Sequence, residues 1–141
     1  MKKLILAVCS LALLACAGMS TPAASSADLL HHRYDLESVN GKTIQPMGDN
    51  AERTPRIEFQ EGNRVAGVIC NFYNGPVTIE DGVMKGVLAS TLMACIDPVL
   101  AEAENAFMQA VSEGAKLNLN KDKLIMTQGN NMLIFKLNDY K

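Results

Sequence analysis

Residues 77–87 read Val-Thr-Ile-Glu-Asp-Gly-Val-Met-Lys-Gly-Val, and this stretch decides the fold class. Apolar and polar residues alternate on both sides of Asp81-Gly82, as they do in strands that bury one face. An Asp-Gly pair accommodates the positive φ angles of a two-residue turn, so the chain can reverse direction there. The stretch therefore predicts an antiparallel β-hairpin.

The same alternation continues on both sides of this hairpin. In a first strand at residues 32–39, Tyr34, Leu36 and Ser38 share one face and Val39 belongs to the other. Asn40-Gly41 is a turn signal that ends this strand. Further strands are predicted at residues 57–60, 64–70, 88–94, 117–120, 124–127 and 133–137, which gives seven or eight short strands in all.

One segment has helical periodicity instead. Asp97 is a favourable N-cap, Pro98 suits the first turn because no partner is needed there for an N–H, and Gly114 can end the helix with a positive φ. The apolar residues form one stripe, namely Leu100, Ala103, Phe107 and Val111. Glu104 projects from this apolar face, so its carboxylate must find hydrogen-bond donors. The pattern predicts a mostly β, α+β fold, in which one amphipathic helix near residues 97–113 covers an antiparallel sheet.

The N-terminus is typical of a bacterial export signal. Lys2 and Lys3 precede an uncharged apolar stretch at residues 4–14. Ala15 is then followed by Cys16, and residues 13–16 resemble a lipobox, in which the thiol is acylated before the signal is removed. The alternative is an ordinary secretory signal that is cleaved within residues 23–27.

The lipobox interpretation divides the chain into three parts. Residues 1–15 are the signal peptide, residues 16–27 are the lipidated Cys16 and a flexible tether, and residues 28–141 are the folded domain. Ala17 rather than Asp follows the cysteine, and in lipoproteins this favours passage to the outer membrane. We therefore expect a lipid-anchored protein on the periplasmic face of the outer membrane.

Charge excludes one class of partner. The 141 residues carry a formal charge of −2, with a pI near 5.6. Loss of Lys2 and Lys3 with the signal leaves 11 of the 13 basic residues against 15 acidic ones, a formal charge of −4. Because binding to a nucleic-acid backbone requires a basic surface, no nucleic acid is expected as a partner.

The four cysteines fall into place under the same interpretation. Cys9 leaves with the signal and Cys16 receives the lipid, so Cys70 and Cys95 remain. In an oxidising compartment such a pair suggests one disulfide, and closing a 26-residue loop would stabilise the fold by roughly 3.5 kcal/mol. Two separate buried thiols are the alternative.

Several residues of the predicted domain together resemble the META domain pattern. They are Gly67, Asn71, Gly75, Thr91, Met93 and Glu104, together with Cys70 and Cys95. The resemblance runs from about residue 31 to residue 137, and residues 31–42 look particularly like the heat-inducible, HslJ-like members. It implies a compact, barrel-like antiparallel sheet with one helix, similar in shape to the lipid-binding pilotins. It also implies a role in heat shock, envelope stress, novobiocin-type resistance or motility, with no assigned reaction.

Within this pattern, Asn71, Thr91 and Glu104 are the strongest candidates for a site. We expect Glu104 to reach from the helix to amides or side-chain donors in residues 70–75 or 91–95. Such a contact would lock the helix to the sheet, so the expected role is structural rather than catalytic.

No motif has the spacing of a cofactor or metal site. His31 and His32 are adjacent, so on a strand they would point to opposite faces and could not share one ion. A thiol nucleophile would need Cys70 or Cys95 in reduced form beside a histidine. We therefore predict no cofactor, no metal and no catalytic residue, and we do not expect an enzyme.

The resulting prediction is a non-enzymatic, outer-membrane-anchored module that binds or steadies an envelope component, and that is most simply a monomer. The alternative is a carrier of lipid or of a hydrophobic small molecule. In that case the domain's methionines would border a soft groove between helix and sheet rather than fill the core. They are Met84, Met93, Met108, Met126 and Met132.

Overall fold

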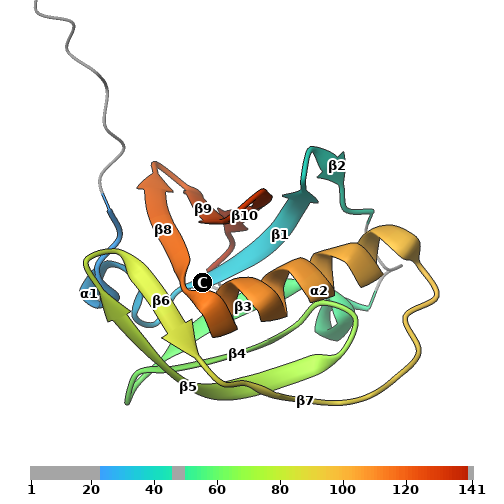
Figure 1. Cartoon of the computed structure of the whole chain (residues 1–141), viewed down its shortest axis with the longest axis horizontal. Helices are drawn as coiled ribbons and strands as arrows, with labels where there is room; N and C mark the ends of the chain where they lie inside the picture. The colour runs from blue at the N-terminus through green and yellow to red at the C-terminus, as the bar shows by residue number, and fades with distance from the viewer. Residues whose placement is uncertain (1–22, 46–49, 140–141) are drawn as a thin grey trace, which may run out of the picture.

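The computed structural model describes residues 23–45 and 50–139, which form a β-barrel with one long helix (Figure 1). The strands are β1 (Arg33–Val39), β2 (Lys42–Thr43), β3 (Arg56–Gln60), β4 (Arg64–Val68), β5 (Phe72–Glu80), β6 (Val83–Gly86), β7 (Ala89–Ser90), β8 (Ala115–Asn120), β9 (Lys123–Gln128) and β10 (Asn131–Leu137). The helices are α1 (Ser26–Leu29), the 3-10 helix η1 (Ala51–Arg53) and α2 (Pro98–Glu113).

Eight of these strands close an antiparallel barrel. Their order is β10-β9-β8-β6-β5-β4-β3-β1, and β1 pairs again with β10. The two short strands lie outside this ring, because β2 pairs with β1 and β7 continues along the edge of β5. The prediction of a mostly β, barrel-like fold with one amphipathic helix is confirmed. Within the described residues, no helix is both long and apolar enough to cross a membrane.

The hairpin predicted at residues 77–87 is present as β5 and β6. Asp81 and Gly82 have φ angles of 50° and 72°, as a two-residue turn requires, and Glu80 pairs with Val83 across it. The turn therefore fixes the register of the strand pair from which the rest of the barrel continues.

The predicted burial pattern of the first strand is wrong at its end. A β-bulge shifts the β1–β10 register between Leu36 and Ser38. The extra residue turns the following side chains over, so Val39 is fully buried and Ser38 is only half-buried. The inward-facing alternation therefore holds for Tyr34 and Leu36 but not for Ser38, whose place in the core is taken by Val39.

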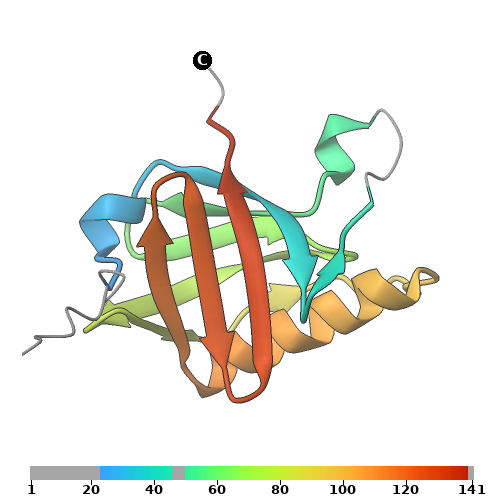
Figure 2. The ribbon, with the colours of Figure 1, turned by 90° about the horizontal axis from the view of Figure 1, so that it is seen from above.

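Helix α2 has the predicted caps and lies along one side of the barrel, as Figure 2 shows from above. The Asp97 carboxylate accepts hydrogen bonds from the N–H groups of Val99 and Leu100, and Gly114 has a φ of 116°. The predicted apolar stripe is buried. At its centre the Phe107 ring lies 4.6 Å from that of Tyr73, so the helix packs directly on β5.

The folded domain begins earlier than predicted, because the last residues of the predicted tether belong to it. Ala23 forms a bridge with Asn118, and Ala24 is 2% exposed and donates a hydrogen bond to the carbonyl of Leu117 (3.0 Å). Ser25 and Asp28 then form a capping box that starts α1. The prediction of a flexible tether is therefore wrong for residues 23–27, and Cys16, the predicted lipidation site, lies outside the described residues.

The strand predicted at residues 88–94 is also much shorter, since only β7 is regular. Beyond β7, Thr91 still donates a hydrogen bond to the carbonyl of Phe72, but β5 begins at that residue and offers no partner to the residues that follow. The chain instead continues in an extended loop to α2, and side chains replace the missing backbone pairing.

Candidate functional site

Four of the residues that carry the family resemblance meet where α2 crosses the start of β5, namely Asn71, Thr91, Met93 and Glu104. The Glu104 carboxylate accepts hydrogen bonds from the backbone N–H groups of Cys70 (2.9 Å) and Asn71 (2.5 Å), both through Oε2. Its Oε1 accepts a third hydrogen bond from Nδ2 of Asn71 (2.7 Å). The helix is therefore held to the turn before β5 by one carboxylate, which is the contact that the sequence predicts.

The Asn71 side chain is 5% exposed and passes this contact on to the loop after β7. Its Oδ1 accepts hydrogen bonds from the N–H of Met93 (2.6 Å) and from the hydroxyl of Thr91 (2.9 Å). Its Nδ2 donates to the Met93 carbonyl (3.2 Å) as well as to Glu104. The amide thus binds both backbone groups of Met93, as a neighbouring strand would, and uses its whole hydrogen-bonding capacity.

Thr91 completes this polar lock, which consists of Asn71, Thr91, Glu104 and the backbone of Met93. The Thr91 hydroxyl accepts a hydrogen bond from the N–H of Phe72 (3.1 Å) while it donates to Asn71. The Thr91 N–H in turn donates to the Phe72 carbonyl (3.0 Å). Every side chain of the lock is therefore engaged in holding backbone or another lock residue.

A disulfide between Cys70 and Cys95 lies beside the polar lock. Their Cα atoms are 5.9 Å apart, and the bond encloses β5, β6, β7 and most of the loop that leads to α2. Cys70 is buried, and Cys95 is half-buried in the loop. The disulfide and the lock therefore restrain the same loop from two directions.

The two glycines of the family pattern allow close approach of backbone. A Cβ at Gly67 would lie 2.2 Å from the carbonyl oxygen of Arg56 and 2.7 Å from the hydroxyl of Tyr73. A Cβ at Gly75 would lie 2.6 Å from the carbonyl oxygen of Val87. Both positions therefore exclude a side chain, one at the β3–β4 contact and the other beneath the segment between β6 and β7.

Sequence reasoning missed the apolar surface that this loop presents. Val87, Leu92 and Ile96 are 81%, 96% and 94% exposed. An apolar hollow of about 480 Å³ lies beside Ile96, and its lining includes Met93 and Arg53. Sequence patterning gave no sign of this exposure for Val87 and Leu92, because it placed Val87 in the predicted hairpin and Leu92 in the strand predicted at residues 88–94.

The methionines do not border one continuous groove between helix and sheet. Met84 and Met126 are fully buried and fill the core, and Met108 is half-buried. Met93 and Met132 are 42% and 46% exposed. The five residues therefore divide between core filling and two separate surface positions.

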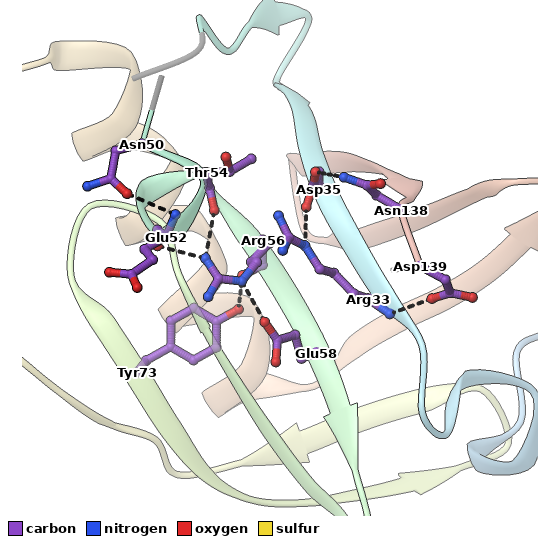
Figure 3. A network of polar contacts seen from close by, with 10 residues as sticks. All are labelled: Arg33, Asp35, Asn50, Glu52, Thr54, Arg56, Glu58, Tyr73, Asn138 and Asp139. Carbon is purple, nitrogen blue, oxygen red and sulfur yellow. Dashed lines mark hydrogen bonds and ion pairs between the residues drawn. The ribbon is translucent and has the colours of Figure 1, made fainter. Parts of the chain in front are cut away.

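A second polar cluster covers β1 and β3 on the outside of the barrel, as Figure 3 shows. Arg33 pairs with Asp35 (2.7 Å) along β1, and Arg56 pairs with Glu58 (2.5 Å) along β3. Across the two strands Arg33 stands opposite Glu58, and Asp35 stands opposite Arg56. Alternating charges at i and i+2 were the available signal for this cluster, which stabilises the strand pair through cross-strand attraction.

The two adjacent histidines have separate partners. Nδ1 of His32 lies 2.6 Å from a carboxylate oxygen of Asp139, and Nε2 of His31 lies 3.6 Å from Glu61. Residues 23–45 and 50–139 contain no group of three His, Cys, Asp or Glu side chains placed to hold a metal ion.

Among the ionisable groups with shifted pKa values, Tyr34, Tyr73 and Asp139 belong to the framework. Burial raises the pKa of Tyr34 to about 12, with the negative charge of Asp139 adding to the shift. Burial raises the pKa of Tyr73 well above its usual value, and its hydroxyl donates to the Arg56 carbonyl (2.8 Å). Desolvation would raise the pKa of Asp139, but hydrogen bonds from the Arg33 N–H and from His32 lower it overall.

Comparison with known proteins matches this architecture to one family. The model of the META domain matches residues 27–140. The chain belongs to the META domain family. A curated relative of this META domain protein, "Heat shock protein HslJ" of Escherichia coli (strain K12), is 34% identical over 132 residues, which cover 92% of this chain and 91% of the relative.

Two protein structures solved by NMR share the fold of this META domain. One is 33% identical, with a TM-score of 0.74, and the match covers 82% of this chain and 97% of the solved one. The other comes from Burkholderia xenovorans and is 19% identical, with a TM-score of 0.66 over 97% of this chain and all of the solved one. The second likeness is one of fold alone.

Proposed function

We propose that this META domain protein is a non-enzymatic module of the bacterial envelope that acts in the response to heat or envelope stress, including resistance to novobiocin-type inhibitors. The observation that carries the proposal is the similarity over nearly the whole chain to a protein named as a heat shock protein. Residues 13–16 further support attachment to the outer membrane through a lipid on Cys16, with the domain facing the periplasm.

The use of the polar side chains supports a binding role rather than a catalytic one. The polar groups of Asn71, Thr91 and Glu104 form hydrogen bonds with backbone groups and with one another. Cys70 and Cys95 are joined, so neither presents a thiolate for nucleophilic attack. A reaction centre requires groups that are free to contact a substrate, whereas these groups hold a loop in place.

One observation favours the carrier alternative. The apolar hollow of about 480 Å³ beside the disulfide is lined by Cys70, Cys95, Leu100 and their neighbours, and is large enough for part of an acyl chain or of a hydrophobic drug. Native mass spectra of the purified protein, recorded before and after solvent extraction, test this function. Extra mass that extraction removes would favour the carrier.

The anchoring part of the proposal is tested by mass spectrometry of the protein isolated from bacterial membranes. We expect wild-type protein to begin at Cys16 and to carry acyl chains, and to fractionate with the outer membrane. A Cys16→Ala variant should lack the lipid. A wild-type protein that begins within residues 23–27 without lipid would contradict the anchor.

The stress role is tested by complementation of a strain that lacks the gene. Growth at raised temperature and in novobiocin should be restored by wild-type protein, and only partly by Cys16→Ala protein made at the same level. Glu102→Gln is a suitable control, because this half-buried carboxylate on α2 pairs with Lys42 and lies outside the polar lock. Equal growth of the deletion strain and its parent under both conditions would contradict the role.

A further inference from the structure

The segment that follows β6 has one edge without a partner strand. β7 pairs with β5 through Tyr73 and Asn74, whereas β8 pairs with β6 only at Val83 and Met84. Residues 89–94 are all exposed. In the described part of the chain, the sheet order places no further strand beyond this segment. We call the outer side of residues 88–94 the free edge.

The backbone of the free edge continues the spacing of a strand. On its inner side Ala89 pairs with Asn74, the Thr91 N–H donates to the Phe72 carbonyl, and Met93 bonds through both backbone groups to the Asn71 side chain. These inner residues are two apart, as in an antiparallel ladder. The peptide groups between them therefore face outward, and they belong to Ser90, Leu92 and Ala94.

The free edge lacks the features with which proteins normally protect an edge. Residues 86–96 read Gly-Val-Leu-Ala-Ser-Thr-Leu-Met-Ala-Cys-Ile and contain no charged residue and no proline. Lysine, proline and inward-pointing charges are the usual means of preventing strand addition. Here the almost fully exposed side chains of Leu92 and Ile96 flank the outward peptide groups instead. Covering such a surface with an apolar strand lowers the free energy, because apolar side chains leave water.

The free edge is also held ready for a partner. Asn71 fixes Met93, the disulfide fixes Cys95, and the helix cap at Asp97 fixes the end of the loop. A partner that pairs with this segment does not have to order it first, so less conformational entropy is lost on binding. The polar lock therefore does more than stabilise the fold, because it also keeps the free edge in an extended conformation.

Arg53 indicates the charge of the partner. Its guanidinium lies 5.2 Å from the centre of the Phe72 ring and 3.8 Å from Sδ of Met93. Within residues 23–45 and 50–139 it forms no ion pair with a carboxylate. A cation next to the apolar surface is suited to a carboxylate of the partner, which it can bind through two parallel hydrogen bonds.

We propose that an extended, apolar peptide segment of another protein binds to the free edge as an added β-strand, with an acidic group next to Arg53. This mode uses backbone hydrogen bonds for affinity and alternate side chains for selectivity. In Figure 1, α1 lies at one end of the molecule, and the loop that leads from β7 to α2 runs toward the other end. A lipid-anchored chain can thus present the free edge away from its anchor, and only this last step rests on the proposed function.

The test uses the mature chain from residue 16 with Cys16→Ser, so that lipid plays no part. The probe is the acetylated, amidated peptide Val-Thr-Val-Thr-Val-Asp, followed by NMR and amide hydrogen exchange. We expect saturation with the peptide to slow exchange of the Ser90 and Leu92 amides at least tenfold. The same peptide with N-methylated valines should not bind, because it loses the donors on one side. This second probe needs no variant of the protein.

Two variants refine the test. Leu92→Pro removes an outward N–H and should weaken peptide binding at least tenfold, whereas Leu92→Ala keeps the N–H and should weaken it severalfold at most. Arg53→Gln should weaken binding severalfold and abolish its dependence on salt. Met132→Ala truncates an exposed apolar side chain on β10 and serves as the control.

Three results would overturn the proposal. One is peptide addition without protection of the Ser90 and Leu92 amides. Another is a concentration-dependent dimer that protects the same amides without peptide, because the occupant would then be a second copy. The third is binding to phosphatidylglycerol vesicles that depends on Leu92 and Ile96, which would identify a lipid surface. Lipidation of Cys16 is measured separately, so failure of the anchor leaves this outcome unaffected.

Discussion

At the scale of single residues, the carboxylate of Glu104 connects three parts of the chain. It leaves the apolar stripe of α2, binds the N–H groups before β5, and reaches the loop after β7 through Asn71. Because hydrogen bonds to a charged acceptor are stronger than neutral ones, one side chain can hold these parts in a fixed arrangement. Because both oxygens of Glu104 accept hydrogen bonds, the site cannot accommodate a donor group in place of either oxygen.

Glu104→Gln should therefore lower the stability of the fold. In either orientation the new NH₂ group faces a donor, namely the N–H groups of Cys70 and Asn71 or the Nδ2 of Asn71. We expect the free energy of unfolding in urea to fall by about 2–4 kcal/mol. Glu102→Gln lies on the same helix and removes an ion pair with Lys42 of β2 that solvent still reaches, so it should cost less than about 1 kcal/mol. Equal losses in the two variants would contradict the lock.

Because of Tyr34, the free energy of unfolding is expected to decrease at alkaline pH. Burial raises the pKa of Tyr34 to about 12, whereas an unfolded chain releases this proton near pH 10. Between these values the folded state holds more protons than the unfolded state, so its stability is complete below pH 10 and falls as pH rises toward 12. Urea midpoints measured from pH 8 to 11.5 should show this decline. Tyr34→Phe should make it shallower, and an unchanged slope would contradict the assignment.

At the scale of secondary-structure elements, the sequence predicted features that depend on neighbouring residues, but not those that depend on contacts with distant segments. The Asp81-Gly82 turn and the Asp97 cap are written within a few residues, and both were predictable. The bulge that buries Val39 depends on pairing with β10, almost a hundred residues away. Likewise, the order of residues 23–27 depends on β8, which the sequence does not place beside them.

The candidate site divides in the same way. Glu104 was identifiable because a charge interrupts an apolar helical stripe, and its partners followed from the family pattern. The position of Arg53 beside Phe72, and the exposure of Leu92, arise only when the barrel closes and leaves one edge unpaired. Sequence patterning alone assigns an apolar, strand-like segment to the core, and so it hides a surface of this kind.

The β3–β4 contact depends on the absence of a side chain at Gly67. A Cβ there would lie 2.2 Å from the Arg56 carbonyl oxygen, so the strands or the Tyr73 ring would have to move. We expect Gly67→Ala to lower the free energy of unfolding by about 3 kcal/mol or more, or to prevent folding. Gly62→Ala is the matched control on the same hairpin, because its Cβ meets nothing within 4 Å. Its positive φ should cost about 1 kcal/mol. Thermal and urea unfolding compare the two.

At the scale of the whole molecule, the disulfide between Cys70 and Cys95 affects both the stability of the fold and the conformation of the loop between β7 and α2. The barrel closes through β1 and β10, which lie outside the segment enclosed by Cys70 and Cys95. The disulfide therefore restrains the unfolded chain without being needed to close the barrel. The loop, in contrast, depends on it locally, together with the hydrogen bonds of Asn71 to Met93.

Replacing both cysteines should separate these two effects. For a loop of 26 residues, the chain-entropy model predicts a loss of about 3.5 kcal/mol in the free energy of unfolding for Cys70→Ala/Cys95→Ala. Far-UV circular dichroism should remain that of the barrel, since β1 and β10 still pair. Amide exchange should accelerate in residues 89–97 more than in β10, because only the loop loses a native-state restraint. Wild-type protein should lose the same stability in reductant, whereas the double variant should not respond. Uniform acceleration across β10 and the loop would show instead that the disulfide acts on global unfolding alone, and that the polar lock suffices to hold the free edge.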